Sequence, residues 1–208
     1  MTATLYDLPR SSASYRVRIA CNLKGVSYER VRVDLVKNEQ RTPDFLEINP
    51  SGLVPVFQDA EGQAHSQSLA IMKYLDATHP SPRLFPEDPM DESAVWELAS
   101  IIACDIHPLN NLRVLRYLKT KLGADDRARD AWYRHWIKLG FEALEARAQK
   151  NAGPYLLGET LTAADVCLVP QMYNARRYET PLSAFPTLRD IDARLQAMEP
   201  IAAASPDA

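Results

Sequence analysis

The sequence RSSASYRVRIA, residues 10–20, decides how this chain is organised. It follows a short apolar segment, Ala3 to Tyr6, which a proline ends. It enters a run in which Val17, Ala20 and Cys21 share one helical face. The pattern predicts a strand, a loop and the start of a helix.

Three serines, Ser11, Ser12 and Ser14, crowd the predicted helix start. A helix N-terminus carries a partial positive charge and free N–H donors, so it stabilises a thiolate or a carboxylate. A serine at this place also serves as an ordinary helix cap, which is the simpler interpretation of an isolated Ser-x-x-Ser. These three serines alone do not distinguish a helix cap from an anion-binding site, so the rest of the sequence is needed.

Composition restricts the classes of function. The chain has 208 residues and a formal net charge of -3, with no clustered run of Lys and Arg, so we expect no nucleic-acid partner. No segment resembles a signal peptide or a membrane span, which predicts a soluble cytoplasmic protein without a membrane partner. Cys21, Cys104 and Cys167 are expected to be buried free thiols. The spacing of ligand-type residues predicts no metal site.

The first part of the chain alternates predicted strands and helices. After the first helix, the predicted elements are a strand at 28–33, a short helix at 42–46, strands at 53–57 and 63–65, and an amphipathic helix at 66–78. This β-α-β-α-β-β-α order predicts a thioredoxin-like domain over residues 1–80.

Two places in this domain suit a peptide ligand. If the Val54-Pro55 bond is cis, the N–H and C=O of Val54 face outward and can pair with a peptide backbone, although most X-Pro bonds are trans. Gln67 and Ser68 fall in the first turn of a helix, where they suit a carboxylate or form a plain capping pair. Gln40 lies in a polar loop and is expected to be solvated.

The second part of the chain is predicted to be helical. A proline-rich linker at 81–89 separates it from the first domain, and an all-α domain follows over 90–208. Pro108 and Pro170 should each interrupt a helix. Thr162 and Asp165 form a capping box, and residues 200–208 are expected to be a frayed tail.

The quoted stretch resembles the Ser-Ser-Cys-Ser-x-Arg-Val-Arg-Ile-Ala signature of zeta-class glutathione transferases, a family that includes maleylacetoacetate and maleylpyruvate isomerases. The likeness spans nearly the whole chain, and Ala13 stands where the family has a cysteine. Further similar segments follow in the family's order: Asn49-Pro50, Val54-Pro55, 67–71, 106–112 and 165–171.

The resemblance implies the glutathione transferase fold, an α/β thioredoxin-like N-terminal domain followed by an all-α C-terminal domain, with glutathione as cofactor and a homodimer as the assembly. It implies that Ser11 donates to the glutathione thiolate, with Ser12 and then Ser14 as the other candidates. It implies that Arg10 and Arg176 bind the carboxylates of a small dicarboxylate substrate, with Arg113 a weaker candidate. The implied glutathione contacts are Ser11, Ser12, Gln40, Val54, Pro55, Gln67, Ser68, His107 and Asn111.

The implied reaction is cis-trans isomerisation, in which the thiolate adds to a conjugated double bond, a single bond rotates and the thiolate leaves. Maleylacetoacetate to fumarylacetoacetate, a step in aromatic amino-acid breakdown, is the first choice, and maleylpyruvate isomerisation is the nearest rival. General conjugation of electrophiles comes next, and a non-enzymatic glutathione-binding module comes last. Because Ala13 removes the family thiol, reactions that need a protein thiol there should be poor.

Overall fold

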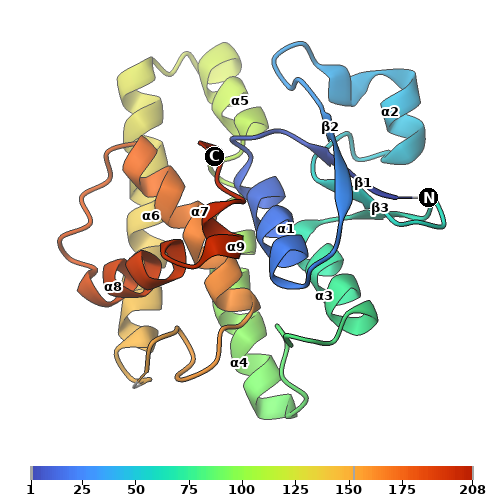
Figure 1. Ribbon diagram of the computed structural model, residues 1–208. Coiled ribbons are helices and arrows are strands. Elements are labelled where there is room, and N and C mark those ends of the chain that lie inside the picture. The colour runs from blue at the N-terminus through green and yellow to red at the C-terminus, as the bar shows by residue number, and fades with distance from the viewer. Residues whose placement is uncertain (1, 152, 208) are drawn as a thin grey trace. The chain divides into compact units, whose positions relative to one another are not determined.

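The computed structural model describes residues 2–151 and 153–207. The chain divides into two compact units, one made of residues 1–84 together with 197–208 and the other of residues 85–196 (Figure 1). The predicted linker at 81–89 falls at this division. The fold class is confirmed, because the first unit carries a four-stranded mixed sheet and the second is helical.

The first unit has the thioredoxin-like order that the sequence predicted. Strand order in its sheet is β2-β1-β3-β4, with β1 parallel to β2 and antiparallel to β3. Its elements are β1 Ala3–Asp7, α1 Ser12–Leu23, β2 Tyr28–Arg32, a 3₁₀ turn Glu39–Arg41, α2 Pro43–Ile48, β3 Val56–Gln58, β4 Ala64–Ser66 and α3 Ser68–Thr78.

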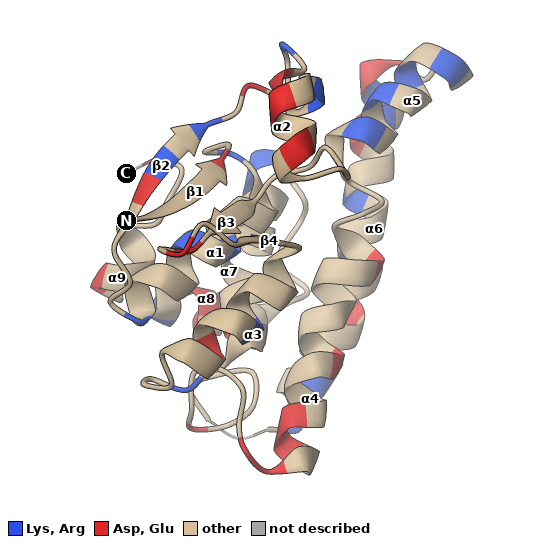
Figure 2. Cartoon of the chain, turned by 90° about the vertical axis from the view of Figure 1, so that its right-hand side faces the viewer, with Lys and Arg blue, Asp and Glu red and all other residues tan. Residues whose placement is uncertain are grey.

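Successive side chains of each strand point to opposite faces of this sheet, and helices pack on both faces. Tyr6 and Val56 are paired in register and pack with Phe45 of α2. Leu5 and Phe57 are the next pair and face the other way, where Phe57 contacts α3. Since α1 and α3 pack side by side, their N-termini belong to one face of the sheet (Figures 1 and 2).

A buried ion pair ties the end of α3 to α1. The Lys24 ammonium donates to Asp76 Oδ1 at 2.8 Å and to the carbonyl oxygens of His79 and Pro82 at 2.6 and 2.8 Å. Asp76 Oδ1 also accepts from the Leu84 N–H. The first half of the predicted linker is therefore held against the first unit.

The prediction of a frayed tail is wrong. Residues Glu199–Ala202 form a short helix, α9, that packs against α1, and Ile201 is fully buried. Arg18 Nε donates to the Ala204 carbonyl and Asn22 Nδ2 to the Pro200 carbonyl, both at 2.9 Å. Proline is tolerated in a first helical turn, so Pro200, the second residue of α9, does not prevent this helix from forming. The tail belongs with residues 1–84, not with the helical domain in which the 90–208 boundary placed it.

The second unit is helical, and three of its helices begin at side-chain caps. Asp88, Asn111 and Asp125 each accept from a backbone N–H of the helix that follows. The helices are α4 Pro89–Ser100, a π-helix Ile101–Ile106, α5 Leu112–Leu122, α6 Asp126–Ala148, α7 Ala163–Arg177 and α8 Pro186–Gln196.

Two prolines behave differently in this unit. The chain leaves the helical path before Pro108, as predicted, and the exit is a π-helix in which His107 N donates to Ile102 O. Pro170 was expected to interrupt its helix, but α7 continues through it. A proline removes one backbone bond, and residues 163–172 are all buried, so packing overrides that loss.

The described residues also bear on the predictions about membrane spans, metal sites and cysteines. No helix of the described residues is long and apolar enough to cross a membrane. Within the described ranges, no group of His, Cys, Asp and Glu is placed to hold a metal ion. Cys21 and Cys167 are buried free thiols, but Cys104 is exposed, contrary to expectation. In the π-helix that contains Cys104, Ile102 and Ile106 are the buried residues.

Candidate functional site

Ser11 is the N-cap of α1. Its Oγ accepts from the Ser14 N–H at 3.3 Å, and its own N–H donates to the Leu8 carbonyl at 2.9 Å. The capping interpretation is therefore correct for Ser11. A hydroxyl that accepts one bond keeps its hydrogen for donation, so capping leaves Ser11 able to donate to an anion at this helix end.

The other two serines are less accessible than Ser11. Ser12 is buried, and Ser14 is fully buried, with no hydrogen-bond partner for its Oγ among the described residues. The first turn of α1 contains no acidic residue, so nothing there neutralises the positive end of the helix. Ser11 is half-buried and is the most accessible of the three serines, and its contact with a ligand sulfur stays a prediction.

The Val54-Pro55 peptide bond is cis, which is the condition the sequence argument set. Neither the N–H nor the C=O of Val54 joins a backbone hydrogen bond within the described part of the chain. Pro55 is buried directly before β3. The backbone of Val54 is thus open to pairing, and its contact with glutathione stays a prediction.

Gln67 has an unusual backbone. Its φ of 68° and ψ of 116° put a non-glycine residue in a region that costs about 1–3 kcal/mol, and such positions cluster at ligand sites. It occupies the N-cap position of α3, but its side chain makes no capping bond. The plain capping pair is therefore wrong for Gln67, whose amide is left for other partners.

Ser68 is the first residue of α3 and is buried. Its Oγ accepts a hydrogen bond from Arg16 Nη1 at 3.1 Å. The first turn of α3, like that of α1, contains no acidic residue. Both helix N-termini are therefore suited to negative charge.

Gln40 is not solvated, contrary to expectation. It lies in the 3₁₀ turn with 9% of its surface exposed, and its Oε1 has no hydrogen-bond partner among the described residues. A buried amide oxygen without a donor is costly, so a ligand N–H would satisfy it. The prediction that Gln40 meets glutathione remains open.

In the second unit, three predicted residues lie close together in sequence where the π-helix meets α5. His107 is half-buried and follows the π-helix directly. Asn111 caps α5 by accepting from the Arg113 N–H at 3.0 Å, and Arg113 is exposed. Further cations follow on α5, along which Figure 2 shows several blue segments: Arg116, Lys119 and Lys121.

The two predicted arginines differ in their partners. Arg10 is exposed directly before Ser11 and makes no ion pair among the described residues. Arg176 donates from Nη1 to Asp192 Oδ2 at 2.5 Å. Burial raises the pKa of Asp192, and the Arg176 guanidinium opposes that rise. A substrate carboxylate at Arg176 would compete with Asp192, whereas Arg10 has no such competitor, and both assignments stay predictions.

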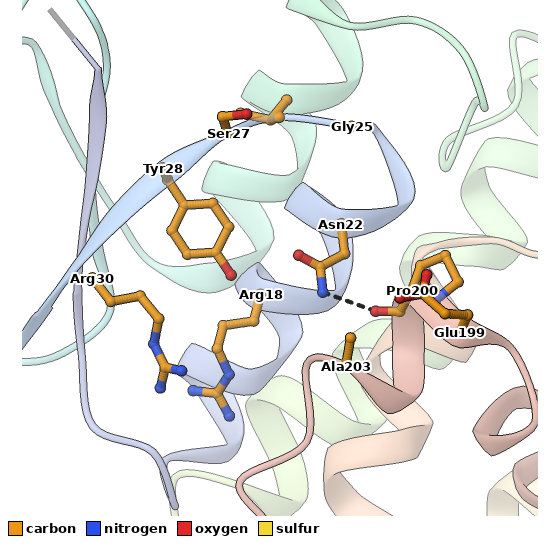
Figure 3. A pocket seen from close by; sticks show the side chains of 10 residues that line it. Arg18, Asn22, Gly25, Ser27, Tyr28, Arg30, Glu199, Pro200 and Ala203 are labelled. Atoms are coloured by element: carbon orange, nitrogen blue, oxygen red, sulfur yellow. Dashed lines mark hydrogen bonds between the residues drawn. The ribbon is translucent and has the colours of Figure 1, made fainter. Parts of the chain in front are cut away.

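An open pocket of about 620 Å³ lies elsewhere in the first unit, between α1, β2 and α9 (Figure 3). Arg18 and Arg30 line it, and both guanidinium groups bind the same buried carboxylate, Asp7. No residue predicted for the site lines this pocket. The sequence did not predict it because one wall is α9, most of which lies in the segment that was expected to be a frayed tail.

Comparisons with known proteins agree with this geometry. The family model for the glutathione S-transferase N-terminal domain matches residues 1–77, and that for the C-terminal domain matches residues 111–204. A probable maleylacetoacetate isomerase of Vibrio cholerae is 49% identical over 100% of this chain and 97% of its own length. A maleylpyruvate isomerase of Ralstonia is 43% identical, covering 98% and 97%.

Solved structures give the same picture. The holo structure of a zeta-class maleyl pyruvate isomerase has a TM-score of 0.94 and 42% identity, covering 98% of this chain and 96% of that one. A maleylacetoacetate isomerase from Methylobacterium extorquens, solved with bound malonate and glutathione, also has a TM-score of 0.94, with 36% identity and the same coverage. The likeness therefore extends over nearly the full length of the chain.

Proposed function

This chain belongs to the glutathione S-transferase family, among its zeta-class members, and we propose that it is a glutathione-dependent cis-trans isomerase of a maleyl-type dicarboxylate. The proposal rests on two helix N-termini, that of α1 at Ser11 and that of α3 at Gln67-Ser68. Neither has an acidic residue in its first turn, and both belong to one face of the sheet. Glutathione has a thiol in its middle, which becomes an anion when it ionises, and a carboxylate at its γ-glutamyl end. One tripeptide can therefore supply an anion to each of the two helix N-termini.

The residues present fit glutathione. Ser11 has a hydrogen to donate to sulfur, Val54 has an open backbone N–H and C=O for the cysteinyl part, and Gln40 has an unsatisfied buried oxygen. Gln67 and Ser68 suit the γ-glutamyl carboxylate. We assign His107 and Asn111 to the same ligand from the second unit, on the strength of the family resemblance.

When bound, glutathione supplies the thiolate that adds to the cis double bond and leaves again after rotation about the resulting single bond. Ser11 holds that sulfur ionised by donating to it, and the α1 N-terminus adds its partial positive charge. Lowering a thiol pKa by one unit favours the thiolate by about 1.4 kcal/mol. Arg10, with Arg176 and Arg113, would hold the substrate carboxylates, because a guanidinium binds a carboxylate through two parallel bonds.

Ala13 is compatible with this reaction. Isomerisation uses only the sulfur of glutathione, so a methyl group in place of the family cysteine removes no required group. Reactions that end in a mixed disulfide between glutathione and the protein would lack their resolving thiol at this position. The chain therefore keeps the isomerase chemistry and is expected to be poor at such thiol-dependent reactions.

We favour maleylacetoacetate as the substrate. The relative named a probable maleylacetoacetate isomerase is 49% identical to this chain, whereas the maleylpyruvate isomerase is 43% identical. The two substrates differ mainly in their distal tails, and general conjugation of electrophiles remains the further alternative. We place the enzyme in aromatic amino-acid breakdown, as a cytoplasmic homodimer. The family resemblance supports these assignments. The free cysteines of this chain are consistent with a reducing compartment.

The test is the loss of near-ultraviolet absorbance of maleylacetone, with and without glutathione, for the wild type and Ser11→Ala. We expect kcat/KM to fall about 100-fold in Ser11→Ala, as it does when one stabilising donor is removed from an active site. Ser11→Asp separates capping from donation, because aspartate caps a helix as well as serine does but repels a thiolate.

Ser183→Ala, at an exposed position, is the control and should keep full activity. If the wild type binds glutathione by calorimetry but does not isomerise maleylacetone, the isomerase proposal fails and conjugation or binding alone moves to the front.

A further inference from the structure

Arg16 is a buried arginine to which the sequence argument gave no role. It lies in the second turn of α1 with 1% of its surface exposed, and its Nη1 donates to Ser68 Oγ at 3.1 Å. Long helical side chains lean toward the N-terminus of their helix. The contact with Ser68 accordingly places this guanidinium at the N-terminal end of α3, inside the first unit.

The bond from Arg16 fixes the direction in which Ser68 can donate. A serine hydroxyl has one hydrogen and two lone pairs. Since Arg16 donates to one lone pair and has no acceptor of its own, the hydrogen of Ser68 must point away from Arg16. At the start of α3, that hydrogen joins the free backbone N–H groups of the helix as a donor to an anion.

Arg16 also contributes charge. A guanidinium is always protonated, and a fixed positive charge in a water-poor site acts on a nearby anion more strongly than the same charge in water. Arg16 therefore stabilises an anion held by Ser68 in two ways, through the orientation of the hydroxyl and through its own field.

We propose that Arg16 is a positioning residue for glutathione, which orients Ser68 and reinforces the subsite for the γ-glutamyl carboxylate. This inference rests on the proposed function, because it assigns the ligand of Ser68 as that carboxylate. In consequence α1 serves both anionic groups, with Ser11 at its start for the sulfur and Arg16 one turn later for the carboxylate.

Arg18 provides a matched control on the same helix. It is also 1% exposed, but its guanidinium binds the Asp7 carboxylate at 2.8 Å and the carbonyl oxygens of Pro9 and Ala204. Its charge is compensated by a protein carboxylate, and its partners hold the fold together. Removing it should change stability and leave the carboxylate subsite intact.

The experiment compares Arg16→Gln, Ser68→Ala and their double variant with the wild type, using glutathione and cysteinylglycine, which lacks the γ-glutamyl group. We expect Arg16→Gln to raise the KM for glutathione about tenfold, typical of a lost bond to a charged group, with kcat at saturation within twofold. The KM for cysteinylglycine should not change. The double variant should be no worse than the more affected single variant, because both changes remove one interaction.

Arg18→Gln should lower the midpoint of thermal unfolding and leave both KM values unchanged. The inference is overturned if Arg16→Gln leaves the KM for glutathione within twofold, raises it equally for both thiols, or adds fully to Ser68→Ala. Arg16→Lys covers a failure of the glutamine variant to fold. It should raise the KM for glutathione about threefold and that for cysteinylglycine not at all, and an equal rise for both overturns the inference.

Calorimetric binding of glutathione to the same variants separates this inference from the isomerase proposal. If the wild type binds glutathione without isomerising maleylacetone, the isomerase proposal fails, and a tenfold loss of affinity in Arg16→Gln still supports the role of Arg16.

Discussion

Asp165 shows how a single buried side chain serves more than one element. Its carboxylate accepts from the Thr162 N–H at 2.9 Å, and the Thr162 side chain accepts from the Asp165 N–H; these two bonds are the predicted capping box of α7. The carboxylate also accepts from the Thr162 hydroxyl at 3.1 Å. It also accepts from the Leu156 N–H at 2.9 Å, which the sequence did not predict. One carboxylate thus starts α7 and fixes the loop before it.

This carboxylate predicts a pH dependence of stability. Burial raises the pKa of Asp165 to about 6, although the hydrogen bonds from Leu156 and Thr162 act to lower it. The folded state therefore binds a proton more readily than the unfolded state, whose aspartate has a pKa of about 3.9. Asp165 contributes stability that is fully present below about pH 4 and is lost as the pH rises through about 6.

Urea unfolding of the wild type and Asp165→Asn at several pH values checks this. Between pH 7 and pH 4, the free energy of unfolding of the wild type should rise relative to the variant by about 2–3 kcal/mol. Asp190→Asn, at an exposed position on α8, should show no such trend. The prediction would be contradicted if the difference in free energy of unfolding between the wild type and Asp165→Asn stayed constant with pH.

At the scale of residues, the sequence predicted what is local. The partners in the capping box are three residues apart, and the residue types at the start of α1 identify a helix N-terminus directly. The bond between Arg16 and Ser68 joins residues 52 positions apart. No periodicity records such a pairing, so Arg16 was seen only as part of a motif.

At the scale of elements, the π-helix Ile101–Ile106 packs closely against α6. Gly140 of α6 faces this segment, and a Cβ at Gly140 would collide with Cδ1 and Cγ1 of Ile106. The absence of a side chain there allows the π-helix and α6 to come close. This position explains a glycine in the middle of a long helix, where alanine would otherwise be preferred.

Gly140→Ala should therefore destabilise the protein, despite the better helix propensity of alanine. We expect a loss of about 1–3 kcal/mol in the free energy of unfolding, the usual cost of forcing atoms into a packed core. Ile106→Val reduces the collision, so the double variant should be more stable than the sum of the two single effects predicts. If Gly140→Ala is as stable as the wild type, the contact between Gly140 and Ile106 is not tight.

Elements were predicted well where sequence period and end signals agree, and poorly where packing decides. The thioredoxin-like order followed from alternation, turns and caps. The continuation of α7 through Pro170 did not, because the burial of that helix outweighs one missing backbone bond. The π-helix has no sequence signature of its own, although the position of Pro108 indicated that the helix would end there.

At the scale of the whole molecule, the C-terminal tail completes the first unit. Ile201 and Ala204 are buried, and the carbonyl groups of Pro200 and Ala204 accept from Asn22 and Arg18 of α1. Deleting residues 197–208 would expose the apolar face that Ile201 covers and leave Arg18 Nε without this acceptor. The tail is therefore a part of the fold and its loss should be costly.

Ile201→Ala tests this without deletion. We expect the free energy of unfolding to fall by about 2–4 kcal/mol, as for other isoleucine truncations in a core. A chain that stops after Ser205 keeps all of the contacts just described and should be as stable as the wild type. An unchanged unfolding midpoint in urea for Ile201→Ala would show that α9 does not stabilise the first unit.

The division of the chain was predicted only in part. The prolines near residue 85 mark the boundary, because they cannot continue either a helix or a sheet ladder. The return of residues 197–208 to the first unit depends on contacts with α1 across most of the chain, and nothing in the composition of the tail indicates them.

This return has a consequence for synthesis. A chain leaves the ribosome from its N-terminus, at roughly 5–20 residues per second. The first unit has its whole sheet within residues 1–84, yet it receives α9 only after the entire second unit has been made. The unit that is translated first is therefore finished last, and a nonsense codon just after Gln196 would spare every residue of the second unit while leaving the first incomplete.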